Sequence, residues 1–323
     1  MKNDKVQILR AAAIMAVIII HTCPSSMEVW VRPFVNFAVA MFLFLSGYLT
    51  VFDRYSSNKQ WLRFYWKRTI RVLVPYMIWT FLYTVLSPRN IGTRFLYNIA
   101  TAGGGANLYY IFVYVQLALF TPLFKIASRS RYRFLIFAIG PLSLLFFKYL
   151  PLLHGHELGK LTGIWWSTSC LAWIPYYYFG LLCGNGIVRA QCKTSWLTFF
   201  YLAALSLEMF EGYFLQYHGI PNCGSQLKLS TYLTNTAVLF ASCRFLACSY
   251  DVSGHKALLL TGSFSFGIYF VHVLLIKILR HIPIYGMIPF PLNSFVLLSA
   301  SLAAIIISDK ILGKRLSALL GLR

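Results

Sequence analysis

Acidic side chains are the scarcest feature of this sequence. Its 323 residues include only 8 Asp and Glu, and the four charged residue types make up 11% of the chain. Soluble domains usually carry about 25% charged residues. Because 59% of the residues are hydrophobic and 17% aromatic, a single soluble core could not bury so much apolar surface. The composition therefore excludes an ordinary soluble protein and requires the bilayer as solvent for much of the chain.

The sequence also lacks the spacings of common metal, redox and nucleotide sites. Its 7 cysteines form no CxxC pair and have no zinc-ligand spacing to histidine. His154, His156 and Glu157 lie close together but lack a further well-spaced partner. No P-loop, GxSxG elbow or dinucleotide fingerprint occurs. We therefore expect no metal site and no chemistry that depends on a P-loop, a GxSxG elbow or a dinucleotide-binding motif.

Positive charge, in contrast, is abundant: 29 Lys and Arg give a formal net charge of +21. Such an excess is typical of proteins that bind nucleic acid. Here the basic residues form short clusters between apolar segments, as at Arg129, Arg131 and Arg133. This arrangement favours the positive-inside rule of membrane topology, so we expect membrane lipids and no nucleic acid among the partners.

The hydropathy pattern predicts an all-α, polytopic membrane helix bundle of about ten transmembrane helices, each needing about 20 mainly apolar residues. The first apolar run follows a basic start but ends without a small-x-small cleavage site, so we interpret it as an uncleaved span. With the N-terminus inside, most Lys and Arg fall on the inner side, which predicts that both termini are cytoplasmic. No linker divides the chain, and a single domain over 1–323 is the simplest interpretation. The expected spans are 8–24, 33–52, 72–88, 107–127, 134–150, 168–187, 196–211, 230–249, 258–280 and 291–309.

The first candidate site lies in the opening helix, where Arg10 and His21 are eleven positions apart. Eleven steps of about 100° return both side chains to one face, about 16 Å apart along the axis. Arg10 would lie at the cytoplasmic edge and His21 deep in the bundle. A desolvated imidazole stays uncharged, which suits a general base. The alternative is an interfacial histidine that merely ends the span.

The second candidate is the basic and aromatic segment WLRFYWKRTIRVLVPY. On a helix, Arg68 and Arg71 face the same way, and Lys67 lies four positions before Arg71. On the inner face these groups are suited to binding phosphates. The alternative is an amphipathic interfacial helix whose cations reach lipid headgroups.

The third candidate is GSFSFGIYFVHVLLI, in which Ser265, Tyr269 and His272 fall at i, i+4 and i+7 on one helix face. A polar stripe in an apolar span should face the bundle interior. The alternative is a structural hydrogen-bond seam between helices. Glu28, in a short outer loop, and Glu208 with Glu211, near the outer end of a span, are weaker candidates that a surface or structural role also explains.

At these residues the sequence resembles the acyltransferase 3 family of bacterial membrane proteins. Arg10-x10-His21 matches the first-helix signature, and Arg68-x-x-Arg71 is followed by Pro75 as in the family's basic motif. FLFLSGYL, NLYYIFVYVQLALFTPLF, YYYFGLLCG and FSFGIYFVHVLL resemble further landmarks in the same order. Relatives often have histidine at the head of the fourth-span motif, where this chain has Asn107, which can form hydrogen bonds but cannot act as a base.

The resemblance implies a multi-pass protein of the bacterial inner (cytoplasmic) membrane that transfers an acyl group, commonly acetyl, from coenzyme A to a sugar hydroxyl. The acceptor would be a cell-surface polysaccharide or a lipid-linked precursor. It implies that Arg10, Lys67, Arg68 and Arg71 bind the acyl-CoA phosphates, since the donor is cytoplasmic. His21 would be the general base or an acylated relay.

The remaining roles are expected near that histidine. His272 and Tyr269 would orient the acceptor or donate to the developing oxyanion, and Asn107, Ser265 and Glu28 would contact the acceptor. A polysaccharide or lipid-linked sugar exporter, and an assembly subunit without chemistry of its own, are the competing hypotheses. Neither of them needs an inner basic motif joined to a deep histidine.

Overall fold

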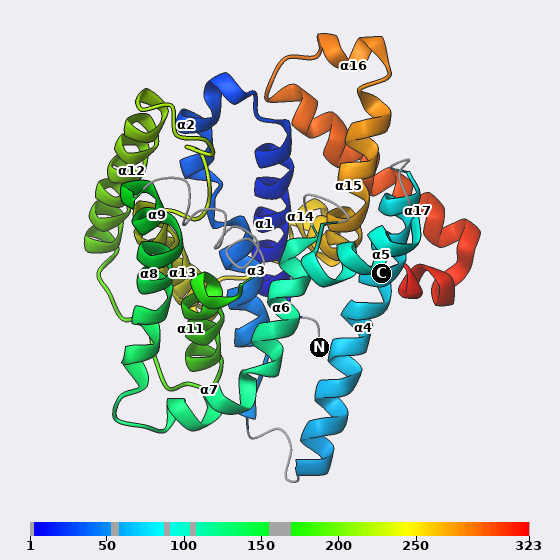
Figure 1. Cartoon of the computed structure of the whole chain (residues 1–323). Helices are drawn as coiled ribbons and strands as arrows, with labels where there is room; N and C mark the ends of the chain where they lie inside the picture. Colours follow the sequence, from blue (N-terminus) through cyan, green and yellow to red (C-terminus); the bar gives the residue numbers. More distant parts are fainter. Residues whose placement is uncertain (1–2, 53–57, 87–90, 104–107, 155–168, 323) are drawn as a thin grey trace.

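The computed structural model describes residues 3–52, 58–86, 91–103, 108–154 and 169–322. Within these ranges the chain is helical, with turns and loops and no strand. Figure 1 shows α1 in the middle of the bundle, with α8, α9, α11, α12 and α13 on one side and α4, α5, α15 and α17 on the other. The helices are α1 (Asp4–Thr22), α2 (Glu28–Val31), α3 (Phe37–Tyr48), α4 (Asn58–Val85), α5 (Ile91–Thr101), α6 (Tyr109–Leu119), α7 (Thr121–Ser128), α8 (Ile139–Leu144), α9 (Leu150–His154), α11 (Ile174–Gly184), α12 (Thr194–Tyr217), α13 (Leu229–Ala247), α14 (Lys256–Ser263), α15 (Ser265–Leu279), α16 (Pro283–Met287) and α17 (Leu292–Leu319).

Four helical stretches of the described chain are long and apolar enough to cross a membrane, and six if each of two bent helix pairs counts as one span. This confirms an all-helical protein with several candidate membrane spans. The straight stretches are Asp4–Thr22, Ser25–Tyr48, Arg133–Leu152 and Leu292–Leu319, and the bent pairs are Tyr109–Leu119 with Thr121–Arg129 and Lys256–Ser263 with Ser265–Leu279.

The count of about ten spans and the cytoplasmic location of both termini stay predictions. The other expected spans coincide with helices α4, α11, α12 and α13, which are too short or too polar to qualify by length and composition. In α13 the polar residues Ser230, Thr231, Thr234 and Asn235 are all buried. A helix that turns its polar side chains into the protein lowers its mean hydropathy without exposing them to lipid, so composition alone cannot decide whether it spans.

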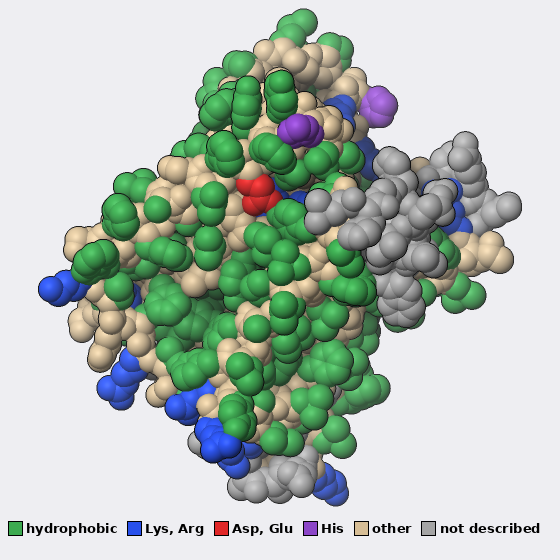
Figure 2. Space-filling view, turned by 60° about the vertical axis from the view of Figure 1, so that its left-hand side comes forward, with side chains coloured by type: hydrophobic (Ala, Val, Ile, Leu, Met, Phe, Trp, Pro, Cys, Tyr) green, Lys and Arg blue, Asp and Glu red, His purple; other side chains and the backbone are tan. Residues whose placement is uncertain are grey.

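The protein surface is rich in large apolar side chains. Leu96, Ile126 and Phe199 are each at least 66% exposed, and hydrophobic side chains cover most of the face shown in Figure 2, with several Lys and Arg at its lower end. In water such a surface would drive aggregation. It is the surface expected of helices that face hydrocarbon.

Helices α3 and α11 approach each other closely enough that glycine is required at their crossing. A Cβ atom on Gly180 would lie 2.0 Å from the backbone oxygen of Phe44, and one on Gly47 would lie 2.1 Å from that of Tyr177. In membranes, helices usually pack through small residues that let their backbones touch. The hydrophobic effect does not drive this packing, because lipid tails are as apolar as the helix surface. The motifs FLFLSGYL and YYYFGLLCG therefore form one helix–helix contact.

Helix α1 packs against α3, α14, α15 and α17. Its buried face is built from Ala11, Ala13, Ile14 and Ile18, where alanine admits close neighbours. Helices α14 and α15 are bent by 75° about Phe264. Irregular backbone at membrane depth is tolerated where it lines a cavity, and this break does so.

Candidate functional site

The basic cavity is a space of about 310 Å³ at the break between α14 and α15. It receives Arg10 from α1 and both Arg68 and Arg71 from α4, which sequence analysis assigned to one ligand. Ser265 and Tyr269 of α15 also line it. None of the described residues that line it is acidic, and three of them contribute guanidinium groups. The described lining residues are Arg10, Phe42, Ser46, Arg68, Arg71, Val72, Tyr110, Tyr114, Ser263, Ser265, Phe266 and Tyr269.

The three arginines differ in how the protein holds them. Arg68 donates to the Thr50 hydroxyl and, at 2.7 Å, to the backbone oxygen of Ser46, and its guanidinium lies 5.5 Å from the centre of the Tyr114 ring. Among the described residues Arg10 and Arg71 donate no hydrogen bond and form no ion pair. Arg68 is thus fixed in place, whereas the charges of Arg10 and Arg71 are available to a ligand.

A second, smaller cavity surrounds His21. This histidine cavity has a volume of about 30 Å³, which is room for about two water-sized groups. Among the described residues that line it are three tyrosines and one residue with an amide side chain, Gln226. The lining residues are Val17, Ile20, His21, Val39, Tyr109, Tyr110, Gln226 and Tyr269.

His21 meets His272 across the contact between α1 and α15. The two ring centres are 5.0 Å apart and the ring planes are inclined by 59°. His272 is fully buried, its Nδ1 lies 3.0 Å from the Ile268 backbone oxygen, and its Nε2 has no hydrogen-bond partner among the described residues. The sequence placed these two histidines in separate candidate sites, and the fold brings them together.

Two tyrosines line both cavities. Tyr110 of α6 and Tyr269 of α15 border the basic cavity and the histidine cavity alike. Their rings meet edge to face with centres 5.5 Å apart. The pair therefore forms the wall between three arginines on one side and an imidazole on the other.

A protein-family model described as an acyltransferase domain, that of acyltransferase 3, matches residues 3–309. The chain belongs to the acyltransferase 3 family. Membership indicates acyltransferase activity, and the apolar helices indicate an integral membrane protein. Searches among curated proteins and among solved structures gave no significant match.

The predicted site residues of this family member do not all meet. Lys67 is exposed and does not line the basic cavity, unlike its neighbour Arg68. Glu28 forms an ion pair with Arg32, with 2.7 Å between Glu28 Oε1 and Arg32 Nη2, and lines neither cavity. Ser265 lines the basic cavity but does not line the histidine cavity. Asn107 lies outside the described residues.

The absence of a metal site was predicted in part from the cluster of His154, His156 and Glu157, of which the structure describes only the first residue. His154 ends α9, while His156 and Glu157 lie outside the described residues. Over the parts of the chain that are described, no group of three or more His, Cys, Asp or Glu is placed to hold a metal ion.

Four residues that build this acyltransferase site were not predicted from the sequence. Tyr110 and Tyr114 lie in NLYYIFVYVQ and Ser46 in FLFLSGYL, so the family motifs contained them without separating them from ordinary packing residues. Gln226 lies in a polar stretch between α12 and α13 that carried no signal at all.

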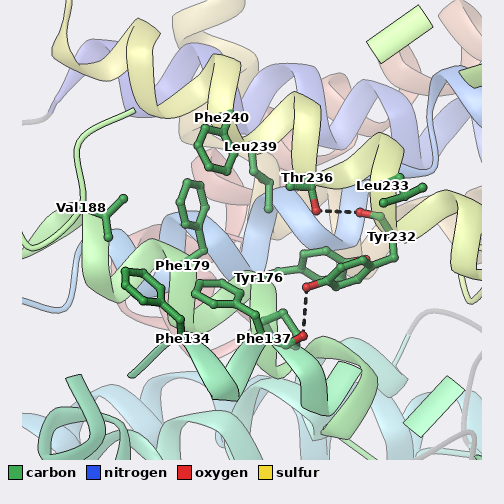
Figure 3. A pocket seen from close by; sticks show the side chains of 11 residues that line it. Phe134, Phe137, Tyr176, Phe179, Val188, Tyr232, Leu233, Thr236, Leu239 and Phe240 are labelled. Atoms are coloured by element: carbon green, nitrogen blue, oxygen red, sulfur yellow. Dashed lines mark hydrogen bonds between the residues drawn. The ribbon is translucent and has the colours of Figure 1, made fainter. Parts of the chain in front are cut away.

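An apolar cavity of about 340 Å³ lies elsewhere in this acyltransferase, between α11, α13 and the segment before α8 (Figure 3). Its few polar groups are satisfied internally: the Tyr232 hydroxyl donates to the Phe137 backbone oxygen at 3.1 Å, and the Thr236 hydroxyl donates to that of Tyr232 at 2.7 Å. The described residues that line the cavity offer no cation, carboxylate or imidazole. It is therefore suited to apolar contacts and not to acyl-transfer chemistry.

Proposed function

We propose that this protein is an O-acyltransferase of the bacterial cytoplasmic membrane. It moves an acyl group, acetyl in the first instance, from cytoplasmic acyl-CoA to a sugar hydroxyl of a cell-surface polysaccharide or a lipid-linked precursor. The observation that carries the proposal is the pair of neighbouring cavities that share Tyr110 and Tyr269 in their linings. One cavity has the charge to bind a polyphosphorylated donor, and the other has a base for an alcohol.

The basic cavity suits the donor in charge and in shape. Guanidinium groups bind phosphate through paired, charge-assisted hydrogen bonds. Arg10 and Arg71 have no competing partner among the described residues, and the first turn of the fifteen-residue helix α15, at Ser265, faces the same space. Free N–H groups at a helix start favour an anion further. A volume of about 310 Å³ is at the lower end of ligand pockets, which fits one part of the donor and leaves the rest at the mouth.

His21 is the general base in this mechanism. Its uncharged imidazole takes the proton of the acceptor hydroxyl as the oxygen attacks the thioester carbonyl carbon. A carbon–oxygen bond forms, the carbon–sulfur bond breaks, and the proton passes from His21 to the departing thiolate of coenzyme A. The products are the O-acyl sugar and free coenzyme A.

The hydrogen bonding of His272 limits what that residue does. A backbone carbonyl only accepts, so the contact with Ile268 requires the proton on Nδ1 and leaves Nε2 as an acceptor. His272 in this tautomer cannot donate to an oxyanion. We therefore assign that donation to Tyr269, and to His272 the role of accepting a hydrogen bond that holds His21 in its reactive orientation.

A transfer assay tests the proposal. Membranes that contain the protein are supplied with radiolabelled acetyl-CoA, and label is measured in ester linkage to glycan and as free acetate. Because general base catalysis contributes about 100- to 10,000-fold, His21→Ala should lower transfer by at least about 100-fold.

The matched control is His281→Ala, which removes an exposed histidine and should change nothing. Full transfer in His21→Ala would overturn the mechanism. Unlabelled glycan with wild-type protein, together with loss of polymer export in a deletion strain, would favour the exporter instead.

A further inference from the structure

Gln226 is one of the residues that line the histidine cavity together with His21. It belongs to the segment between α12 and α13, and its side chain lines that cavity together with His21 and Tyr269. Its amide oxygen Oε1 is buried and has no hydrogen-bond partner among the described residues. A buried acceptor left in this state is costly, so the site is incomplete without a hydrogen-bond donor.

Both neighbours of Gln226 along the chain are held by hydrogen bonds. The backbone nitrogen of Leu227 donates to Ser225 Oγ at 3.1 Å, and Lys148 Nζ donates to the Leu227 backbone oxygen at 2.7 Å. Lys228, the next residue, is fully buried and donates to the Cys223 backbone oxygen at 3.1 Å. The backbone that presents Gln226 is therefore fixed before any ligand arrives.

A buried polar network ties the same segment to the bundle. The carboxylate of Glu208 on α12 accepts from Asn36 Nδ2 and from Thr231 Oγ1, each at 2.7 Å, and its Oε1 lies 4.0 Å from Lys228 Nζ. Glu208 and Lys228 are both fully buried. Asn36 lies one turn before Val39, which lines the histidine cavity. The network thus connects the support of Gln226 to the wall of the cavity.

The cavity fixes the chemistry of its occupant. It has room for about two water-sized groups, so it admits hydroxyls and excludes a sugar ring. In the proposed reaction the attacking hydroxyl gives its proton to His21 and cannot also donate to Gln226. The donor to Gln226 Oε1 must then be a second hydroxyl, close enough to enter the same small space.

We propose that Gln226 is a specificity-determining residue that binds the acceptor hydroxyl adjacent to the one that reacts. The site then selects vicinal diols, the arrangement of neighbouring hydroxyls on a sugar ring, over isolated alcohols. In the absence of acceptor, water satisfies the amide and is displaced by the diol. This inference rests on the proposed acyl transfer and specifies its acceptor class.

The test uses the full chain in lipid nanodiscs with radiolabelled acetyl-CoA and two probe acceptors, trans-1,2-cyclohexanediol and cyclohexanol, at equal concentration. Ester formation on each probe and free acetate are measured together. The wild type should prefer the diol by about tenfold, the effect of one hydrogen bond. Gln226→Met keeps the side-chain length but removes the amide, so it should bring this ratio close to one.

The unfolding midpoint of Gln226→Met in mixed detergent–SDS micelles, compared with that of the wild type, shows that the variant is folded. Gln216→Met, at an exposed position of α12, is the matched control and should keep the wild-type preference. A wild type without preference for the diol, one that esterifies neither probe while releasing acetate, or an unchanged ratio in Gln226→Met would each overturn the inference. A wild type that releases no acetate and transfers no label would instead defeat the proposed function itself.

Discussion

The imidazoles of His21 and His272 lie 5.0 Å apart, centre to centre, although 251 positions separate them in the chain. They come from α1 and α15, which pack against each other. The carbonyl of Ile268 fixes the tautomer of His272 with its proton on Nδ1. In the proposed mechanism, His272 therefore acts on His21 by accepting a hydrogen bond at its buried Nε2 atom.

Replacing His272 by phenylalanine separates this role from simple packing. The substitution keeps a ring in a fully buried position but removes the Nε2 acceptor. If His272 orients His21, kcat should fall by about 100-fold, the lower bound for an acid–base group, while the KM for acetyl-CoA stays the same. The measurement is the steady-state rate of labelled transfer. His281→Phe is the control at an exposed site, and an unchanged kcat in His272→Phe would leave only a structural role.

Arg71 and Lys67 make a matched pair for the donor site. Both are exposed cations on α4, but only Arg71 lines the basic cavity. A charge-assisted hydrogen bond to phosphate is worth about 1.5–3 kcal/mol when shielded from water. Since Arg71 is exposed, we expect Arg71→Ala to raise the KM for acetyl-CoA by about tenfold, the low end of that range.

Lys67→Ala should leave the same KM unchanged and so controls for the loss of one positive charge from α4. The two variants should also differ in salt dependence, because Lys67→Ala keeps Arg71, whose attraction for phosphate is screened by salt, whereas Arg71→Ala has lost it. Equal KM values for both variants would place the donor phosphates elsewhere.

Local spacing predicted the parts of this site that lie within one helix. Arg10 and His21 are on α1, and Ser265, Tyr269 and His272 are on α15, as a helical period requires. Spacing could not predict that the two stripes meet, because the contact depends on how α14 bends into α15 at Phe264. No sequence signal marks that bend.

The separation of Arg68 from Lys67 shows the same limit. Both are basic and adjacent, but successive residues on a helix point about 100° apart, so only one of them reaches the cavity.

Gln226 could not be predicted from the sequence for another reason. The Gln226 amide belongs to a binding site only because the buried network around Glu208 and Lys228 holds its polar segment in place.

The crossing of α3 and α11 should not tolerate a methyl group. In Gly180→Ala the new Cβ would fall 2.0 Å from the Phe44 backbone oxygen, so the two helices must move apart. Overpacking costs about 1–3 kcal/mol where side chains can adjust, and here backbone faces backbone, so we expect at least about 3 kcal/mol. The midpoint of unfolding in mixed detergent–SDS micelles measures the loss. Gly286→Ala, where nothing lies within 4 Å of the added atom, should unfold like the wild type.

The buried pair of Lys228 and Glu208 supplies the last prediction. Lys228→Met leaves the Glu208 carboxylate without its cation in a fully buried position, and breaking such a pair costs about 3–5 kcal/mol. Lys228→Met combined with Glu208→Met removes both charges and should cost much less than the two single variants added together, because replacing a whole buried pair is often close to neutral. The same unfolding assay gives all three values, with the exposed Lys193→Met as the control. Additive losses would mean that the two charges do not stabilise each other, and the support of Gln226 would then have to come from the hydrogen bonds at Leu227 alone.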